Sequence, residues 1–209
     1  LSDQERDLDL ESKLLAEIKQ LESTQKIFKQ DLSVKFPAFT SLASPGPIAL
    51  GKMQEKLKPK DAFVTYLLGR KESFALLIKK NDLHIARIPS GEKAIATSVQ
   101  SLRKGLQPQA GGLGDFDIEE SYDLYSQVLE PFADKLQEIN YLTVNPSGAL
   151  ASLPFAVLVT EAPESATPKL SPSTPWLSKK FALSYVSSIQ SFVALRSRDK
   201  NTSAPKAFF

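Results

Sequence analysis

The stretch Tyr141-Leu-Thr-Val-Asn-Pro-Ser-Gly-Ala-Leu-Ala-Ser-Leu-Pro-Phe155 decides how this chain folds. Its first four residues are aromatic, aliphatic or β-branched and predict a buried strand, which ends at a turn over residues 145–148. Gly148 permits the tight turn because it has no Cβ. Pro154 cannot continue a hydrogen-bonded strand, so we expect it to end the hairpin that follows and to direct Phe155 into the core. A further buried element is predicted over residues 155–159.

Helical and strand-like segments alternate on both sides of this stretch. A strong helix is predicted over residues 121–139, with Leu124, Val128, Phe132 and Leu136 on one face. After the stretch come a surface loop with four prolines over residues 161–175, a strand over 181–186, a helix over 188–196 and the start of a strand over 206–209. The order strand, helix, strand predicts an α/β sheet with a parallel portion.

The first half of the chain predicts a separate set of elements. Three strand-like segments, residues 62–68, 74–80 and 83–88, are joined by short turns and predict an antiparallel meander. A short helix over 48–57 precedes the meander, and a helix that ends at Gly105 follows it. Residues 9–31 lack Gly and Pro and carry apolar side chains at helical spacing, which predicts one long amphipathic helix. That helix is either a single core-facing helix or the last helix of an upstream helical-repeat array, and one helix cannot decide between them.

Composition excludes several kinds of active site. The chain has no Cys and one His among its 209 residues. A thiol nucleophile, a Cys-based zinc or iron–sulfur site and a catalytic metal centre with two or three His ligands are therefore impossible within it. A serine hydrolase would need His84 as its base, and the chain contains no Gly-x-Ser-x-Gly turn to present the serine. Carboxylate or lysine chemistry remains, or no chemistry in this chain.

The other candidate sites are weak. Glycines over residues 111–114 resemble a phosphate-binding loop, but the acidic residues that follow would repel a phosphate, so we interpret them as a flexible loop. The alternation around His84 places it on the polar face of its predicted strand. Glu119 and Glu120 are adjacent and point apart on a helix, unlike the converging carboxylates of acid–base catalysis. Trp176 is expected to be an anchoring core aromatic.

Charge and hydropathy give expectations about partners and location. The net charge is +2, and basic residues outnumber acidic ones by twelve to five between residues 52 and 104. These lysines and arginines are scattered over hairpins and turns without interleaved aromatics, so we expect no nucleic acid. No apolar run approaches the roughly 18 residues of a membrane helix, so we expect no membrane partner. No basic and apolar signal peptide opens the chain, which favours the cytoplasm, and no cofactor is expected.

Two motifs resemble the CHAT family, which comprises caspase-like peptidase domains typically found behind tetratricopeptide repeats. Residues 142–158 are similar to the family's apolar strand, Gly turn and Leu-x-x-Leu-Pro-Phe-x-x-Leu sequence. Residues 176–196 are similar to the strand, serine and helix that come next in that family. Ser187 stands where the family usually has Pro, and Ala156 where an acidic residue is common. The residues that carry the resemblance, all with structural roles, are Asn145, Gly148, Leu150, Leu153, Pro154, Phe155, Trp176 and Ser188.

The resemblance implies the fold class α/β, with a caspase-like mixed sheet flanked by helices, preceded by an antiparallel meander and a long N-terminal helix. It divides the chain into that helix, residues 1–35, and the N-terminal half of a CHAT domain, residues 36–209. In this family the catalytic His follows the next strand and the catalytic Cys the strand after that, so both would follow Phe209. The chain would then supply no catalytic residue itself, and its first partner would be the remainder of the same domain, present either as a second chain or as a continuation after Phe209.

Two functions are compatible with this resemblance. The first is the framework portion of a caspase-like cysteine endopeptidase that acts on protein or peptide substrates. The alternative is a non-catalytic interaction or regulatory module, a pseudo-peptidase linked to helical repeats. Because Leu1 is not an initiator methionine and the last residues are apolar, we expect both ends to be cut. A His-Gly motif and a later Cys after Phe209 would distinguish the peptidase from the interaction module.

Overall fold

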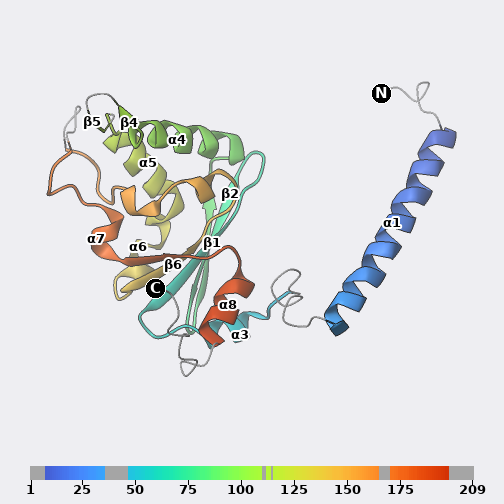
Figure 1. Cartoon of the computed structure of the whole chain (residues 1–209). Helices are drawn as coiled ribbons and strands as arrows, with labels where there is room; N and C mark the ends of the chain where they lie inside the picture. The colour runs from blue at the N-terminus through green and yellow to red at the C-terminus, as the bar shows by residue number, and fades with distance from the viewer. Residues whose placement is uncertain (1–7, 36–46, 110–111, 114, 165–169, 198–209) are drawn as a thin grey trace, which may run out of the picture. The chain divides into compact units, whose positions relative to one another are not determined.

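The computed structural model describes residues 8–35, 47–109, 112–113, 115–164 and 170–197. It divides into two units, Leu1–Pro47 and Ile48–Phe209, which are described separately. The first unit contains helix α1, and the second contains a five-stranded sheet with helices on both faces (Figure 1). The assignment of residues 1–35 and 36–209 as two domains stays a prediction.

Helix α1, Leu8–Lys35, confirms the long helix predicted over residues 9–31. Its 28 residues contain neither Gly nor Pro, so no position interrupts the backbone hydrogen bonds. Its apolar side chains Leu14, Ile18, Leu21 and Phe28 are between 49% and 65% exposed. None of the described helices combines the length and the apolar character that crossing a membrane requires. Both interpretations of α1, as a core-facing helix or as part of a helical array, stay predictions.

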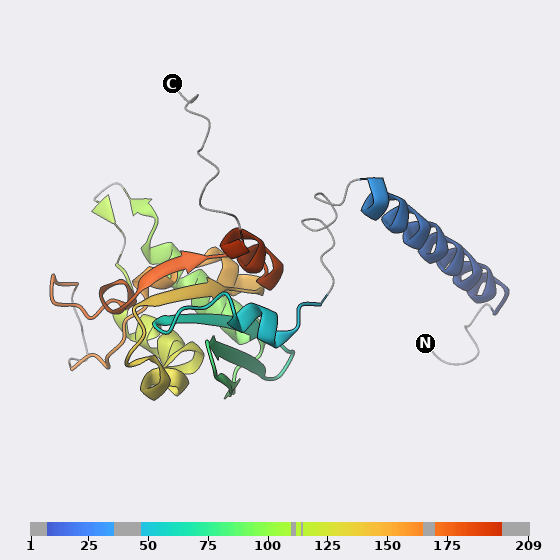
Figure 2. The ribbon, with the colours of Figure 1, turned by 90° about the horizontal axis from the view of Figure 1, so that it is seen from below.

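Five strands form one mixed sheet in the order β3-β2-β1-β6-β7. They are β1 (Asp61–Leu67), β2 (Ser73–Lys79), β3 (Leu83–Ile88), β6 (Tyr141–Asn145) and β7 (Ala182–Tyr185). The antiparallel pairs β1–β2 and β2–β3 confirm the predicted meander. β1, β6 and β7 pair in parallel and lie side by side (Figure 2), so the β1–β6 pair joins the meander to the parallel portion. This sheet with flanking helices confirms the predicted fold class and is compatible with the caspase-like fold.

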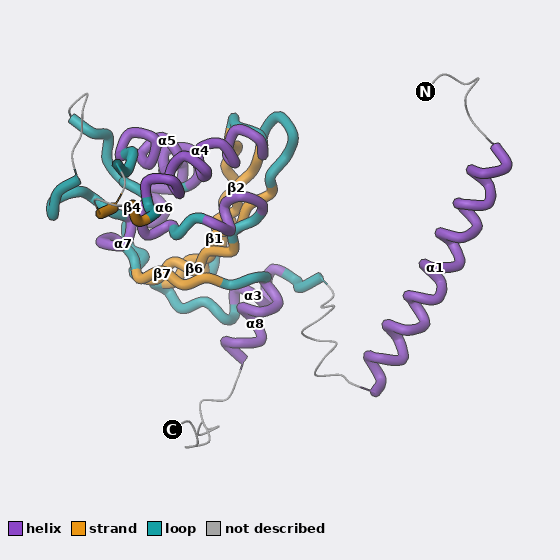
Figure 3. Tube along the Cα trace, turned by 45° about the horizontal axis from the view of Figure 1, so that its top comes forward, coloured by secondary structure: helices purple, strands orange, loops and turns teal. Residues whose placement is uncertain are grey.

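Helices cover the two faces of the sheet unequally (Figure 3). The main core lies under α4 (Glu92–Gly105), α5 (Ile118–Val128) and α6 (Ala133–Leu136), and it receives Ala62, Val64 and Tyr66 from β1. Phe63 points to the opposite face because side chains alternate along a strand. There α3 (Leu50–Gln54) and α8 (Ile189–Ser197) form a smaller cluster, in which the rings of Phe63 and Phe192 lie 5.1 Å apart.

The helix predicted over residues 121–139 is wrong as a single element. The structure has α5, then a 3-10 helix η2 (Glu130–Phe132), then α6. Pro131 explains the interruption, because it has no N–H and its ring clashes with the carbonyl one turn earlier. The backbone turns at Leu129, where φ is −135°. The predicted apolar face survives the break, and its members Leu124, Val128, Phe132 and Leu136 are all buried.

The hairpin predicted around Pro154 is also wrong. Two short 3-10 helices follow β6, namely η3 (Gly148–Ser152) and η4 (Phe155–Val157), and the buried element predicted over 155–159 ends in a single bridge between Val159 and Trp176. Local bonds replace the expected ladder, with the Val157 N–H donating to the Pro154 carbonyl at 3.2 Å. The tight turn itself is confirmed, because Gly148 has φ +52°.

Loops show one feature that the sequence did not predict. Two paired strands of two residues each, β4 (Pro108–Gln109) and β5 (Gly112–Leu113), lie within the loop predicted over 107–117. The glycine loop 111–114 is only partly described, and of the proline-rich loop the structure describes residues 161–164 and 170–175. The strand predicted over 206–209 lies outside the described residues. A short helix, α7 (Leu177–Lys180), leads from the proline-rich loop into β7.

Candidate functional site

The carboxyl ends of β1, β6 and β7 meet at one edge of the sheet. In α/β sheets ligands bind in the crevice outside the carboxyl ends of the parallel strands, so this edge is where a functional site is expected. Thr65 Oγ1 donates to Asn145 Oδ1 at 2.9 Å, which ties the end of β1 to the end of β6. Asn145 Nδ2 donates to the Val186 carbonyl at 3.0 Å, just after β7 ends. One amide side chain therefore connects all three strands.

The turn after Asn145 makes a further connection between the ends of β6 and β1. Ser147 Oγ donates to the Tyr66 carbonyl at 3.0 Å. Gly148 follows with its positive φ, and a Cβ at this position would lie 2.9 Å from Leu68 Cδ1. Both the backbone conformation and the close side chain of Leu68 favour Gly here. The turn is thereby held against the segment that leaves β1.

Phe155 supports the site from within the core. It is fully buried, and its ring lies 5.8 Å from the ring of Tyr66 and 6.5 Å from that of Tyr185. Its backbone N–H donates to Tyr185 Oη at 2.8 Å, so an aromatic side chain of β7 both packs on Phe155 and satisfies its amide. Burial, and next the neighbouring Tyr185, raise the pKa of Tyr66 well above its ordinary value of 10.0. Tyr66 is buried and packs on Phe155, so its role is structural.

The remaining motif residues have local packing roles. Leu150 and Leu153 are buried, and Pro154 precedes η4. Trp176 is half-buried, its ring lies 5.6 Å from that of Phe116, and it precedes α7 and β7, so it lies toward the amino end of β7. This arrangement brings Asn145, Gly148 and Phe155 to the carboxyl edge and leaves Trp176 away from it.

A group of three serines begins α8 beside the carboxyl edge. Ser188 Oγ accepts the Ser191 backbone N–H at 3.0 Å and so caps the helix. The hydroxyls of Ser187 and Ser188 also lie 3.1 and 2.9 Å from that of Ser191. A serine nucleophile needs an adjacent base, and β3, which carries His84, is at the opposite edge of the sheet. Four strand spacings of about 4.8 Å separate β3 from β7, which these serines follow, by roughly 19 Å, so none of the three is placed to pair with His84.

His84 itself lies on the face that the sequence did not predict. It pairs with buried Leu77 on β2 and shares its face with Ile88, whereas Leu83 and Ile85 on the other face are 40% and 64% exposed. The prediction that His84 occupies the polar face is therefore wrong. The helices that cover the main core lie on the His84 side, and β3 is an edge strand whose other face is less covered. Which face of such a strand is buried depends on those helices rather than on its own alternation.

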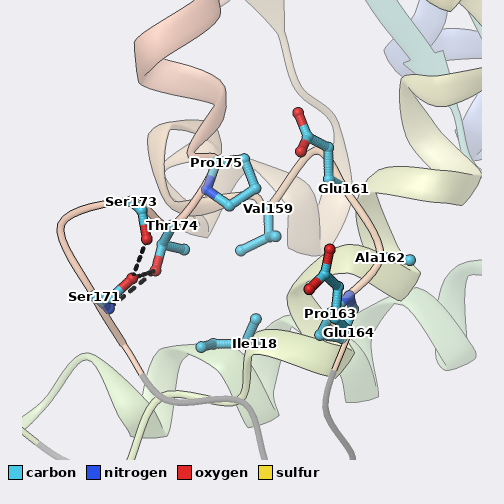
Figure 4. A pocket seen from close by; sticks show the side chains of 10 residues that line it. All are labelled: Ile118, Val159, Glu161, Ala162, Pro163, Glu164, Ser171, Ser173, Thr174 and Pro175. Carbon is cyan, nitrogen blue, oxygen red and sulfur yellow. Dashed lines mark hydrogen bonds between the residues drawn. The ribbon is translucent and has the colours of Figure 1, made fainter.

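A hollow lies between the ends of the proline-rich loop (Figure 4). It measures about 420 Å³ and is lined by Ile118, Val159, Glu161, Ala162, Pro163, Glu164, Ser171, Ser173, Thr174 and Pro175. Its hydroxyls bond locally, since Thr174 Oγ1 accepts the Ser171 N–H at 3.0 Å. Glu161 pairs with Lys180 at 3.6 Å. Within the described part of the chain, no group of three or more His, Cys, Asp or Glu side chains is placed to hold a metal ion.

Comparison with known families identifies the part of the chain that carries two of the three strand ends of the carboxyl edge. Residues 119–209 match the CHAT domain. The CHAT match covers all eight residues on which the resemblance rests, together with β6, β7 and α8. It does not include β1, which the sheet joins to the matched segment through the parallel β1–β6 pair. No curated protein matches the chain.

Two residues of this edge were missed by sequence reasoning. Thr65 and Tyr185 each bond to a residue of the CHAT motif, Thr65 to Asn145 and Tyr185 to Phe155. The Thr65 contact joins residues 80 positions apart, so no local pattern could reveal it. The available signal was the position of Thr65 near the end of a predicted strand, but its use required knowing that this strand runs parallel to residues 141–145.

Proposed function

We propose that the Ile48–Phe209 unit is the framework portion of a caspase-like cysteine endopeptidase, whose catalytic His and Cys come from polypeptide that follows Phe209. The observation that carries this proposal is the CHAT match over residues 119–209, which includes the β6 and β7 ends of the carboxyl edge but not the end of β1. Hydrogen bonds of Asn145, Thr65 and Ser147 hold the strand ends of that edge together. The described residues place no thiol and no His at it. The chain would therefore position the catalytic His and Cys without contributing a catalytic residue itself.

The outer edge of β7 is the place where the remainder of the domain would attach. Among the described residues β7 pairs only with β6, and Ala182, Ser184 and Tyr185 are exposed. The Ala182 and Val186 N–H groups donate to the Asn140 and Val144 carbonyls toward β6. In a parallel ladder alternate residues bond to opposite neighbours, so the groups of Leu183 and Tyr185 point outward. A downstream strand that added here in parallel would bring its carboxyl end beside Asn145.

The proposed reaction follows from ordinary thiol chemistry. A Cys thiolate at the end of the added strands would attack the substrate peptide carbonyl and form a thioester, and a His would give its proton to the leaving amine. Water would then hydrolyse the thioester and regenerate the thiol. In this scheme Asn145 and Phe155 are positioning residues, because they fix the strand ends against which the added strand lies. The substrate class is a protein or peptide.

The test compares this chain with a longer chain that continues through the natural protein. Each is incubated with a mixed peptide library and with a fluorescent iodoacetamide. We expect cleavage by the longer chain only, abolished by replacing either its downstream Cys or its downstream His with Ala. As a matched control, His84→Ala in the longer chain should cleave normally, since β3 is remote from the edge. A downstream sequence without His-Gly and a later Cys, or a folded longer chain without turnover, would overturn the peptidase and favour the interaction module.

A further inference from the structure

Helix α1 carries an apolar repeat that the function of the other unit does not use. Leu14, Ile18, Leu21, Phe28 and Leu32 are separated by four, three, seven and four positions. This spacing is the pattern of a coiled-coil seam, with Leu14, Leu21 and Phe28 at the d positions and Ile18 and Leu32 at a positions of successive heptads. Gln25 lies between Leu21 and Phe28, at the a position where the heptad pattern would otherwise place an apolar side chain. We call these six residues the α1 seam.

Most of the seam is open to solvent in the described part of the chain, and Leu32 is half-buried. Leu14, Ile18, Leu21 and Phe28 are 49%, 51%, 63% and 65% exposed. Burying one such side chain fully contributes about 1.5–3 kcal/mol, and most of the stability of helices in proteins comes from packing an apolar face rather than from helix propensity. Gln25 within the seam would fix the register of a partner helix, because a polar group at an a position disfavours misaligned pairs.

Charges beside the seam indicate what kind of helix fits. Glu17 and Glu22 occupy the g and e positions on either side of Ile18 and Leu21. In a parallel pair of α1 copies, each Glu17 would face the Glu22 of the other copy, because g and e residues meet across the seam. In an antiparallel pair centred between Leu21 and Gln25, the two Glu22 residues would face one another. Both pairings of identical copies bring like charges together.

We propose that the α1 seam binds an amphipathic helix of another polypeptide that has the same apolar spacing and carries Lys or Arg opposite Glu17 and Glu22. Such a helix covers the exposed leucines and replaces two like-charge contacts with two ion pairs. This inference is independent of the proposed function, since it concerns only the Leu1–Pro47 unit. It assigns α1 a charge-selective partner rather than self-association.

The experiment uses a probe made from α1 itself. A fluorescent peptide of residues 8–35 carrying Glu17→Lys and Glu22→Lys, the basic-flank peptide, is titrated with the full chain and followed by anisotropy. Its apolar seam is unchanged, and its lysines repel one another, which keeps it from pairing with itself. The matched probe is the unmodified peptide. We expect the basic-flank peptide to bind at least about tenfold more tightly, or about 1.4 kcal/mol. That advantage should shrink as salt is raised, because the ion pairs are exposed.

Two variants of the chain separate seam binding from non-specific attraction. Leu21→Glu places a charge in the seam and should abolish binding of the basic-flank peptide. Gln20→Glu adds the same charge at the neighbouring exposed position outside the seam and should leave binding unchanged. Circular dichroism checks that both variants keep their helix. Equal or tighter binding of the unmodified peptide, no binding of either peptide, or binding that survives Leu21→Glu would each overturn the proposal.

Discussion

Two glycine-to-alanine substitutions with opposite expected signs test the turn that builds the carboxyl edge. Gly148 has φ +52°, and a Cβ there would lie 2.9 Å from Leu68 Cδ1. Gly51 lies in α3, and a Cβ there would meet nothing within 4 Å. The same chemical change therefore meets strain at one position and open space at the other.

The magnitudes follow from the local geometry. Left-handed backbone costs a residue with a Cβ about 1–2 kcal/mol. The loss of chain entropy in the unfolded state offsets about 0.4–1 kcal/mol of this, and Leu68 can rotate its terminal methyl away. We expect a net destabilisation of about 1 kcal/mol for Gly148→Ala, which lowers the melting temperature by about 2–4 °C in a chain of this size. Gly51→Ala should stabilise by about 0.5–1 kcal/mol, because Ala is the better helix former.

Thermal and urea unfolding of the two variants and the parent chain measure these values. The dependence of the unfolding free energy on urea concentration should stay unchanged, so that shifts in midpoint report native-state strain. Shifts of the same sign for both variants would refute the reasoning. A neutral Gly148→Ala would show that the turn tolerates a side chain and that Gly148 is not required by its backbone conformation.

Three further outcomes can be checked on the same chain. Tyr185→Phe removes the hydroxyl that accepts the Phe155 N–H and should cost about 1–3 kcal/mol in urea unfolding, and an unchanged midpoint would contradict the 2.8 Å bond. Because burial raises the pKa of Tyr66, the unfolded state loses this proton first, so stability should hold below about pH 10 and fall above it. Tyr66→Phe should flatten that fall, whereas Tyr141→Phe at an exposed position should not. Finally, the chain alone should cleave no peptide, and any turnover that His84→Ala removes would reveal a site across the sheet.

The sheet could be predicted from local patterns wherever the composition of a strand reflects its burial. Ala62, Phe63, Val64 and Tyr66 are buried, on both faces of β1, and the aromatic and β-branched residues of this segment indicated a strand without ambiguity. The turn at Gly148 was predictable because only a residue without a Cβ adopts that backbone readily. The interruption near Pro131 could also have been found, since a proline inside an apolar helical pattern is itself a signal.

Other features depend on contacts between distant segments. Helices that follow β3 in sequence decide which face of β3 is covered, so the alternation of His84 with Leu83 and Ile85 pointed to the wrong face. The carboxyl edge required the parallel β1–β6 pair, in which Asp61 lies opposite Tyr141. Sequence motifs therefore located the β6 and β7 ends of the candidate site, and only the sheet topology showed that the end of β1 lies beside them.

Asn145 shows why the carboxyl edge is better explained as a positioning surface than as ordinary core. Its side chain accepts from Thr65 at 2.9 Å and donates to Val186 at 3.0 Å, and an amide is the short side chain that can do both at once. A carboxylate would lose the donor and an aliphatic residue both bonds, although either would fill the same volume. Apolar packing already holds these strands together below the edge, where Val64 pairs with Val144 and both are fully buried. The hydrogen bonds of Asn145 therefore fix how the strand ends are oriented relative to one another, because hydrogen bonds are directional and apolar contacts are not. A fold that orients the ends of three parallel strands in this way is suited to aligning a fourth.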